Sequence, residues 1–215
     1  MTGWALVMEI EEVVFDTLGM RSQALHGALR DEGIDVSIAD VIAAHSGSTA
    51  RLAIDTLQIA TSLDAVSRDL VIRRTSDAVR QSLNAGLPAF DRAARDAVQQ
   101  LAINVPMAVV TRASHDDAVR MIEQAELDVC FRTVLSLDDR ARHEQPAVWS
   151  RAASRLFGLQ AVAVGPPQIV DGAREAGLRT IAITASGTAA HDTLVSIAQL
   201  DISYLASLSE TRELS

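Results

Sequence analysis

The chain has 215 residues, which is enough to bury a hydrophobic core in one domain or in a core with a smaller insertion. Its 48% hydrophobic and 22% charged residues are typical of a globular protein and exclude a disordered one. The formal net charge of -9 argues against nucleic acids and anionic membranes as partners, because both require a basic surface.

All 19 basic residues are Arg, so any mechanism that needs a lysine ammonium group is excluded. Cys130 is the only cysteine, which rules out an intramolecular disulfide, and we interpret it as a small buried hydrophobic residue. The sequence shows no signal-peptide pattern and no run approaching the ~18 apolar residues of a membrane span. We therefore expect a cytoplasmic protein.

Short β-rich segments alternate with longer helical patterns, which predicts an α/β fold with a Rossmann-like parallel sheet. Strands are expected at residues 5–10, 107–111, 133–135, 161–164 and 180–183, with 202–205 as a further candidate. Helices are expected at residues 90–101, 115–125, 146–157, 169–176 and 191–199, where apolar residues recur at three- and four-residue spacing. Gly177 is placed as a helix C-cap before the strand at 180–183.

The region from residue 17 to residue 86 breaks this alternation. Helical patterns follow one another at 21–32, 38–45, 49–59 and 63–84, with no convincing strand between them. An all-helical insertion after the first strand predicts a helical cap domain at 17–86. The α/β core is then formed by residues 1–16 and 87–215.

Acidic residues cluster where the first strand ends. The apolar run leads into Glu9, Glu11 and Glu12, and a second apolar patch leads to Asp16 and Thr17. This arrangement resembles motif I of the haloacid dehalogenase-like (HAD) hydrolase superfamily. The segment from Val109 to Ser114 resembles motif II, and the helices at 146–153 and 171–178 resemble those after motifs III and IV.

The resemblance covers nearly the whole chain and implies a HAD-type core with a C1 helical cap, near the β-phosphoglucomutase and phosphoglycolate phosphatase branch. It also implies phosphoryl transfer, with one aspartate as nucleophile and a second as general acid/base. A motif III lysine and a motif IV aspartate complete the family's site, where Mg²⁺ and fixed donors stabilise negative charge.

Motif I of this chain departs from the family pattern at three positions. Glu9 stands at the nucleophile position, Glu11 at the acid/base position and Glu12 at a glycine position. One extra methylene moves the carboxylate oxygens by about 1.5 Å, and a misplacement of ~1 Å can cost on the order of 100-fold in rate. Three adjacent carboxylates also raise the pKa of one of them unless a cation lies nearby. The alternative interpretation is a solvated strand end without chemistry.

Motifs III and IV lack their charged groups. The lysine position falls on His143 or Glu144, and Arg140 or Arg142 is a poor replacement because a guanidinium is not a compact ammonium. After the fourth strand the chain reads Gly165-Pro166-Pro167-Gln168, and the next acid, Asp171, is expected about one turn inside a helix. A Mg²⁺ site would lose its motif IV oxygen ligand.

Thr111 matches the motif II hydroxyl without strain and, with Glu9 and Glu11, completes the set of candidate catalytic residues. Arg51, Arg112 and His143 are candidate ligand-binding residues, although the turn before Arg51 also fits a plain helix N-cap by Ser48 or Thr49. The five histidines show no metal-ligand spacing, and no phosphate-binding or dinucleotide-binding glycine pattern is present.

Our leading hypothesis is a protein with the HAD fold that has lost phosphatase activity and acts by binding a small anionic ligand or a protein partner, without a cofactor. The alternative is a divergent Mg²⁺-dependent phosphatase or phosphomutase that acts on a small phosphorylated metabolite and uses Glu9 as nucleophile. A homo-oligomer is compatible with either hypothesis.

Overall fold

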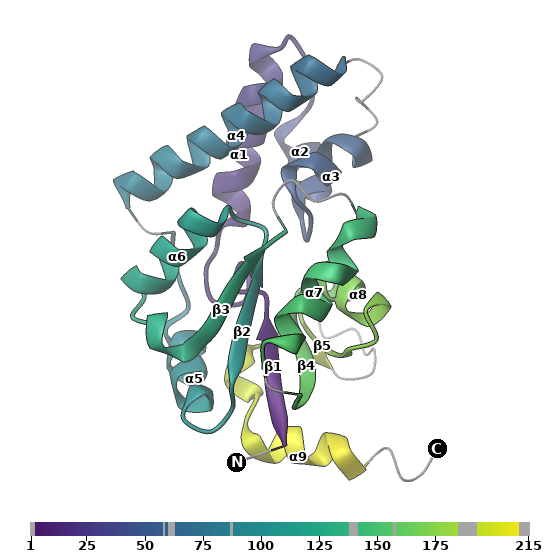
Figure 1. Ribbon diagram of the computed structural model, residues 1–215. Helices are drawn as coiled ribbons and strands as arrows, with labels where there is room; N and C mark the ends of the chain where they lie inside the picture. Colours follow the sequence, from purple (N-terminus) through teal and green to yellow (C-terminus); the bar gives the residue numbers. More distant parts are fainter. Residues whose placement is uncertain are drawn as a thin grey trace.

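The computed structural model describes residues 3–57, 59, 63–86, 88–137, 142–156, 158–184 and 193–210. Its centre is a six-stranded parallel sheet with the strand order β3-β2-β1-β4-β5-β6 (Figure 1). The strands are β1 (Trp4–Met8), β2 (Met107–Thr111), β3 (Phe131–Ser136), β4 (Gln160–Gly165), β5 (Arg179–Ile183) and β6 (Thr193–Leu194). Because the strands are parallel, the carboxyl ends of β1, β2 and β4 meet at one edge of the sheet, where such folds place their ligands.

Nine α-helices lie in the described residues. Five lie between β1 and β2: α1 (Leu18–Asp31), α2 (Ile38–His45), α3 (Ala50–Thr56), α4 (Ala65–Ala85) and α5 (Arg92–Ala102). The others are α6 (His115–Gln124), α7 (Gln145–Ser154), α8 (Pro167–Glu175) and α9 (Ile202–Glu210). Short 3-10 turns lie at η2 (Asp128–Cys130), η3 (Arg142–Glu144) and η4 (Ile197–Gln199). No helix within these ranges has both the length and the apolar content needed to cross a bilayer.

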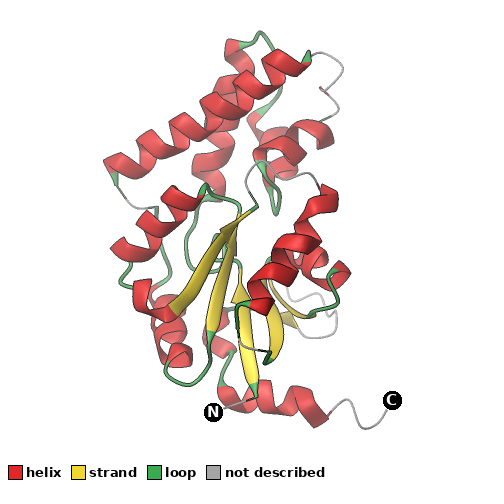
Figure 2. Cartoon of the chain, in the orientation of Figure 1, coloured by secondary structure: helices red, strands yellow, loops and turns green. Residues whose placement is uncertain are grey.

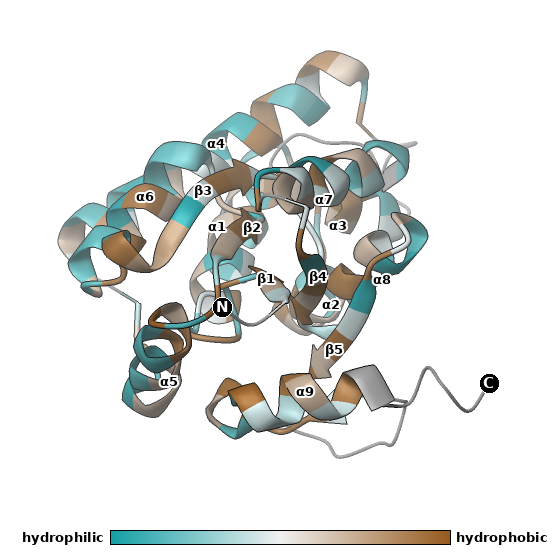
Figure 3. Cartoon of the chain, turned by 60° about the horizontal axis from the view of Figure 1, so that its bottom comes forward, coloured by the Kyte–Doolittle hydropathy of each residue, from teal (hydrophilic) through white to brown (hydrophobic). Residues whose placement is uncertain are grey.

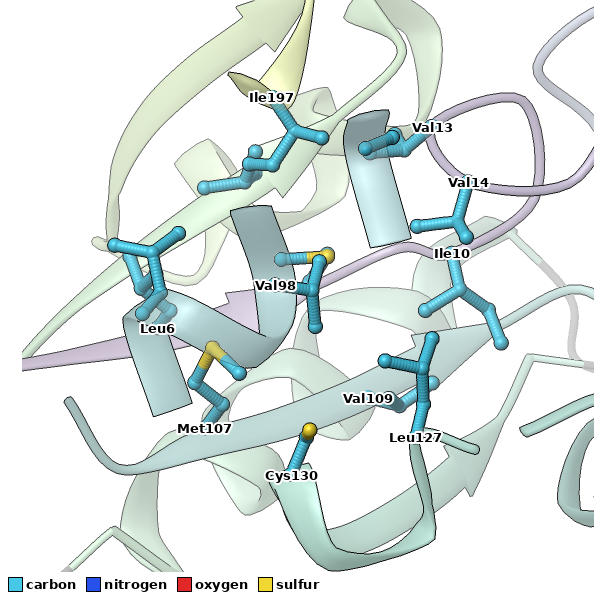
Figure 4. Close-up of a cluster of buried hydrophobic side chains, with 14 of the residues drawn as sticks. Leu6, Ile10, Val13, Val14, Val98, Met107, Val109, Leu127, Cys130 and Ile197 are labelled. Atoms are coloured by element: carbon cyan, nitrogen blue, oxygen red, sulfur yellow. The ribbon is translucent and has the colours of Figure 1, made fainter. Parts of the chain in front are cut away.

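Each face of the sheet carries its own hydrophobic core because side chains alternate along a strand. Leu6 and Met8 of β1 join one core with α5, α6, η4 and α9, part of which Figure 4 shows. Ala5 and Val7 join the other with α7 and α8. Hydrophilic and hydrophobic bands alternate along α4, α5 and α9, as expected for helices with one face on a core (Figure 3).

Helices α1 to α4 lie together beyond the carboxyl ends of the strands (Figure 2) and bury a third core that includes Leu25, Val41 and Val71. Ser37, Thr49 and Asp64 cap α2, α3 and α4 by accepting a hydrogen bond from a first-turn backbone N–H. The described residues from 18 to 86 contain no strand, which confirms the all-helical expectation. The division into a core domain and a cap domain stays a prediction.

The five strands predicted before residue 184 are confirmed, with bounds that differ by at most two residues. Gly177 has a φ of +78°, as expected of a helix C-cap. The candidate strand at 202–205 is wrong, because α9 occupies this segment and Asp201 accepts a hydrogen bond from Tyr204 N at its start. The helix at 191–199 is also wrong: β6 pairs with β5, and η4 follows it, while residues 191 and 192 lie outside the described part.

Candidate functional site

The glutamates after β1 are buried in the interior. Glu9 and Glu11 are 0% and 1% exposed, and Glu12 is partly buried. They lie at the carboxyl edge of the sheet, since Glu9 N donates to Val164 O of β4 and Glu11 is bonded to the residues that end β2. The interpretation of these acids as a solvated strand end is therefore wrong. Burial of this kind requires nearby cations or donors, because an unpaired charge in the interior is costly.

The carboxylate of Glu11 accepts five hydrogen bonds. Its Oε1 atom is approached by one guanidinium and one hydroxyl from the start of α1, and its Oε2 atom by one hydroxyl and two consecutive backbone N–H groups at the end of β2. The donors are Arg21 Nη1 (2.5 Å), Thr17 Oγ1 (3.2 Å), Thr111 Oγ1 (3.1 Å), Arg112 N (2.9 Å) and Ala113 N (2.9 Å).

The side chain of Arg112 contacts all three glutamates from the centre of the cluster. Its Nε lies 3.5 Å from Glu9 Oε1 and 3.8 Å from Glu11 Oε2, and its Nη1 lies 2.8 Å from Glu12 Oε1. The guanidinium is 1% exposed. Burial alone would lower the pKa of Arg112, but the three carboxylates raise it above its ordinary value, so the group stays charged.

Glu9 and Glu11 carry opposite pKa shifts. Burial raises the pKa of Glu9 well above its ordinary value, and Arg112 offsets only part of that effect. Glu9 Oε2 is buried and has no hydrogen-bond partner among the described residues. Burial also opposes ionisation of Glu11, but Arg21 and Arg112 outweigh it and lower the pKa of Glu11 to about 2. The sequence suggested repulsion among the carboxylates as the reason for a high pKa, but burial is the main cause at Glu9, and Glu11 and Glu12 contribute less.

Two guanidinium groups lie against the acids of the cluster. Arg21 and Arg112 face the carboxylates of Glu11 and Glu12, while burial favours the neutral form of Glu9. Glu12 has a φ of +65°, the left-handed conformation that the glycine of the family pattern adopts freely. A non-glycine residue pays roughly 1–2 kcal/mol for this conformation, and the contact with Arg112 opposes that cost.

The positions expected to supply motifs III and IV do not reach the cluster. His143 is exposed on η3; Arg140 and the side chain of Arg142 lie outside the described residues. Asp171 lies one turn inside α8 and pairs with Arg174 at 2.5 Å. At the end of β4, a Cβ on Gly165 would lie 2.9 Å from Glu9 Cβ, so the backbone packs directly on Glu9 and leaves no room for an acidic side chain.

These residues do not fit a magnesium ion. Mg²⁺ requires near-octahedral oxygen ligands at about 2.0–2.1 Å, whereas both Glu11 oxygens are already bonded to donors and the Arg112 guanidinium lies beside Glu9 and Glu11. Nowhere in the described ranges do three or more His, Cys, Asp or Glu residues form a group that could hold a metal.

Arg51 lies apart from the glutamate cluster. It lines a pocket of about 580 Å³ with Asp69, Arg73, Asp77, Arg80 and Ser114, between α3, α4 and the start of α6. Arg51 is half-buried and lies 3.6 Å from Asp69 Oδ1. Thr49 caps α3, which confirms the N-cap interpretation of this turn.

A separate cavity of about 30 Å³ lies beside the glutamate cluster. Glu11, Arg21 and Arg112 line it, together with Ser114, which also borders the pocket of Arg51.

Two residues of the site were missed in the sequence. Arg21 precedes Leu25 and Leu29 on the buried face of α1, and His45 follows Val41 on the buried face of α2. The sequence did contain a signal for both: each is a charged or polar residue at helical spacing from the apolar residues of its helix. His45 is 1% exposed, neither ring nitrogen has a described partner, and burial followed by the charges of Arg21 and Arg112 lowers its pKa well below the ordinary value.

Comparison with solved structures identifies the fold. The chain is similar to β-phosphoglucomutase from Clostridium difficile (10% identity, 98% of this chain and 99% of that chain covered, TM-score 0.72). It is also similar to CbbY from Rhodobacter sphaeroides, solved in complex with phosphate (15%, 93% and 96%, 0.72). A third similar structure is a haloacid dehalogenase-like family hydrolase from Streptococcus pneumoniae (19%, 97% and 100%, 0.69).

No protein-family model matches the sequence. No curated protein matches it either. Since the structural similarity extends over almost the full length of each chain, the resemblance in the sequence is confirmed at the level of the fold. The chain has the fold of the haloacid dehalogenase-like hydrolases.

Proposed function

We propose that this protein has lost the phosphoryl-transfer activity associated with its fold and acts by binding a small anionic ligand. The observation that carries the proposal is the buried guanidinium of Arg112, which contacts Glu9, Glu11 and Glu12. A phosphoryl-transfer site of this type needs its acids to be free to bind a metal and to attack phosphorus. In this chain, arginine side chains neutralise the same acids.

The protonation states oppose the reaction as well. A nucleophilic carboxyl group must be ionised, yet burial raises the pKa of Glu9. A general acid/base works best with a pKa near the operating pH, whereas the pKa of Glu11 is lowered to about 2. Neither glutamate therefore has the protonation behaviour that its position in the family pattern demands.

The pocket between α3, α4 and α6 supports the binding part of the proposal. It offers the guanidinium groups of Arg51, Arg73 and Arg80 against the carboxylates of Asp69 and Asp77. Arg51 and Arg80 form long ion pairs here, at 3.6 Å to Asp69 and 3.8 Å to Asp77, whereas the described part of the chain gives the exposed Arg73 no ion pair. Guanidinium groups with donors left over recognise carboxylates and phosphates, so a small anion is the ligand class that fits.

An activity assay tests the loss of phosphoryl transfer. Purified protein is incubated with Mg²⁺ and an aryl phosphate or a panel of sugar phosphates, in parallel with Glu9→Ala and with Glu32→Ala as a control outside the cluster. We expect wild-type turnover to equal that of Glu9→Ala. Turnover that Glu9→Ala abolishes and Glu32→Ala retains would overturn the proposal and support the alternative, a divergent Mg²⁺-dependent phosphatase or phosphomutase with Glu9 as nucleophile.

A binding assay tests the ligand class. Small carboxylates and phosphates are titrated by calorimetry against the wild-type protein, Arg73→Ala and the control Arg92→Ala, whose arginine is exposed at the start of α5. We expect Arg73→Ala to weaken binding about tenfold, as for the loss of one charge-assisted contact, and Arg92→Ala to leave it unchanged. Equal affinities in all three proteins would exclude the pocket as the binding site.

A further inference from the structure

The donors around Glu11 form a site of their own. Arg112 N and Ala113 N are consecutive backbone N–H groups that both donate to Glu11 Oε2 at 2.9 Å. Successive N–H groups that converge on one point form an anion-binding concavity. The hydroxyl of Thr111 donates to the same oxygen at 3.1 Å. This half of the site is built by the turn that ends β2.

The second half is supplied by the start of α1. Arg21 Nη1 and Thr17 Oγ1 donate to Glu11 Oε1 at 2.5 Å and 3.2 Å, and Arg21 Nη2 also donates to Arg112 O at 3.4 Å. Two backbone N–H groups, two hydroxyls and a guanidinium thus converge on one pair of oxygens. A carboxylate offers about four lone-pair sites, so the donors already exceed its capacity.

We propose that these five donors form an oxoanion-binding site that the carboxylate of Glu11 fills as an internal ligand, which excludes phosphate-like oxoanions from this position in the wild-type protein. The proposal rests on the proposed function, because Glu11 can serve as an internal ligand only if it does not take part in phosphoryl transfer. It goes further because it gives Glu11 an autoinhibitory role at these donors.

The tether explains why Glu11 outcompetes a free anion. An intramolecular ligand acts at an effective concentration of mM or above, without the loss of translational freedom that a free ligand suffers. Glu11 is also fixed through its backbone, since Arg112 Nη2 donates to Glu11 O at 3.4 Å and Glu11 N donates to Glu9 Oε1 at 3.1 Å. Its carboxylate is therefore held at the donors.

Space for a small oxoanion becomes available when the Glu11 side chain is removed. A cavity of about 30 Å³, roughly the volume of one water molecule, already borders Glu11, Arg21, Arg112 and Ala113. Truncation of Glu11 to Ala adds the volume of its carboxylate and one methylene to this cavity and leaves every donor in place. The result is an electropositive site without its anion.

The experiment uses inorganic phosphate as the probe. Thermal unfolding and calorimetric titration with phosphate are measured for the wild-type protein, Glu11→Ala, Glu11→Ala/Thr111→Val and Glu32→Ala, which removes a carboxylate paired with Arg74 outside the site. We expect Glu11→Ala to bind phosphate at least about tenfold more tightly than the wild-type protein and to gain thermal stability from it. Thr111→Val should remove this gain, and Glu32→Ala should not produce it.

The outcomes separate this proposal from the proposed function. Binding of phosphate to the pocket of Arg51 and Arg73 would be equal in the wild-type protein and in Glu11→Ala, so only the difference between them reports on the Glu11 site. If Glu11→Ala does not fold in buffer, phosphate should restore its fold, and Glu11→Gln should show the same gain in smaller measure. No gain in folded Glu11→Ala, or no effect of phosphate on folding together with no gain in Glu11→Gln, overturns the proposal.

Discussion

Glu9 and Glu11 are only two residues apart, yet their surroundings drive their protonation in opposite directions. Glu11 accepts hydrogen bonds from five donors and lies beside two guanidinium groups, which stabilises its charged form. Glu9 shares the burial but has one backbone donor and one more distant guanidinium, so the neutral form is favoured. The local supply of donors, rather than burial, separates the two carboxyls.

Glu11 makes the protein sensitive to acid. Its pKa falls from an ordinary value of 4.5 to about 2, so its charged form stabilises the fold by on the order of 3 kcal/mol. This contribution is complete above pH ~4.5 and is lost as the pH falls towards 2. Glu11→Gln should therefore be less stable than the wild-type protein at neutral pH, and the difference should shrink as the pH falls from ~4.5 towards 2. Urea unfolding at several pH values measures the difference in the free energy of unfolding. A difference that does not change with pH would contradict the lowered pKa of Glu11.

Glu9 has the reverse effect. Its raised pKa means that the folded state holds a proton that the unfolded state releases above pH ~4.5, so the stabilisation is complete below that pH and is lost as the pH rises through the folded-state pKa. Glu9→Gln keeps a neutral group at every pH. We expect the two proteins to be close in stability at pH 4 and Glu9→Gln to become the more stable one as the pH rises. Parallel stability curves from the same unfolding series would show that the pKa of Glu9 is the same in the folded and unfolded states and would contradict this prediction.

At the scale of elements, Arg21 joins α1 to the sheet through Glu11. Both partners are buried, so Arg21→Ala removes the guanidinium closest to Glu11 and should cost about 3 kcal/mol in the free energy of unfolding. Arg74→Ala is the matched control, because Arg74 pairs with Glu32 at 2.7 Å within the helical layer but is 41% exposed. Its loss should cost no more than about 1 kcal/mol. Equal losses in chemical denaturation would show that the Arg21–Glu11 pair is not special.

The turn between α2 and α3 packs on α8 at a glycine. A Cβ on Gly47 would lie 2.7 Å from Gln168 Cβ, and Gly47 has a φ of +64°. Gly33 has a φ of +75° with open space around it, so Gly33→Ala measures the conformational cost alone, about 1–2 kcal/mol. Gly47→Ala should cost a further ~1–3 kcal/mol from overpacking. Equal destabilisation of the two variants in urea would mean that the turn moves away from α8 freely.

The sequence is sufficient to predict the bounds of the elements that have a strong hydrophobic periodicity. Strand β2 and helix α2 have the predicted bounds, because a run of five apolar or β-branched residues and a capped apolar stripe leave few alternatives. The segment after residue 190 was misjudged because β6 has only two residues, and Ile202 gives α9 the composition of a strand. Pairing with β5, which is not local in the sequence, decides the first case; the cap at Asp201 decides the second, and this local signal was missed.

The candidate site was predictable in position but not in arrangement. Glu9, Glu11, Thr111 and Arg112 do meet at the carboxyl edge of the sheet, as the strand ends imply. Their mutual neutralisation was not predictable, because Arg21 comes from α1 and its place beside Glu11 depends on how α1 packs. Arg51 and His143 do not join them.

At the scale of the whole molecule, the fold and the buried site carry different information. The fold is shared with a haloacid dehalogenase-like hydrolase and a β-phosphoglucomutase over nearly the full chain, whereas the acids at the end of β1 are paired with arginines from α1 and from the turn after β2. Fold alone does not establish function. Here Arg21 and Arg112 balance the charges of Glu11 and Glu12, and this charge balance opposes the binding of a divalent cation at the cluster.

Calorimetric titration of the wild-type protein with MgCl₂, with Glu9→Gln as the control, tests this charge balance directly. We predict no saturable binding up to ~10 mM Mg²⁺ and no change in Tm when EDTA is added, because a ligand that does not bind the folded state does not stabilise it. Saturable Mg²⁺ binding below ~1 mM that Glu9→Gln abolishes would contradict the account. It would mean that Arg112 yields its place among the glutamates to a metal ion.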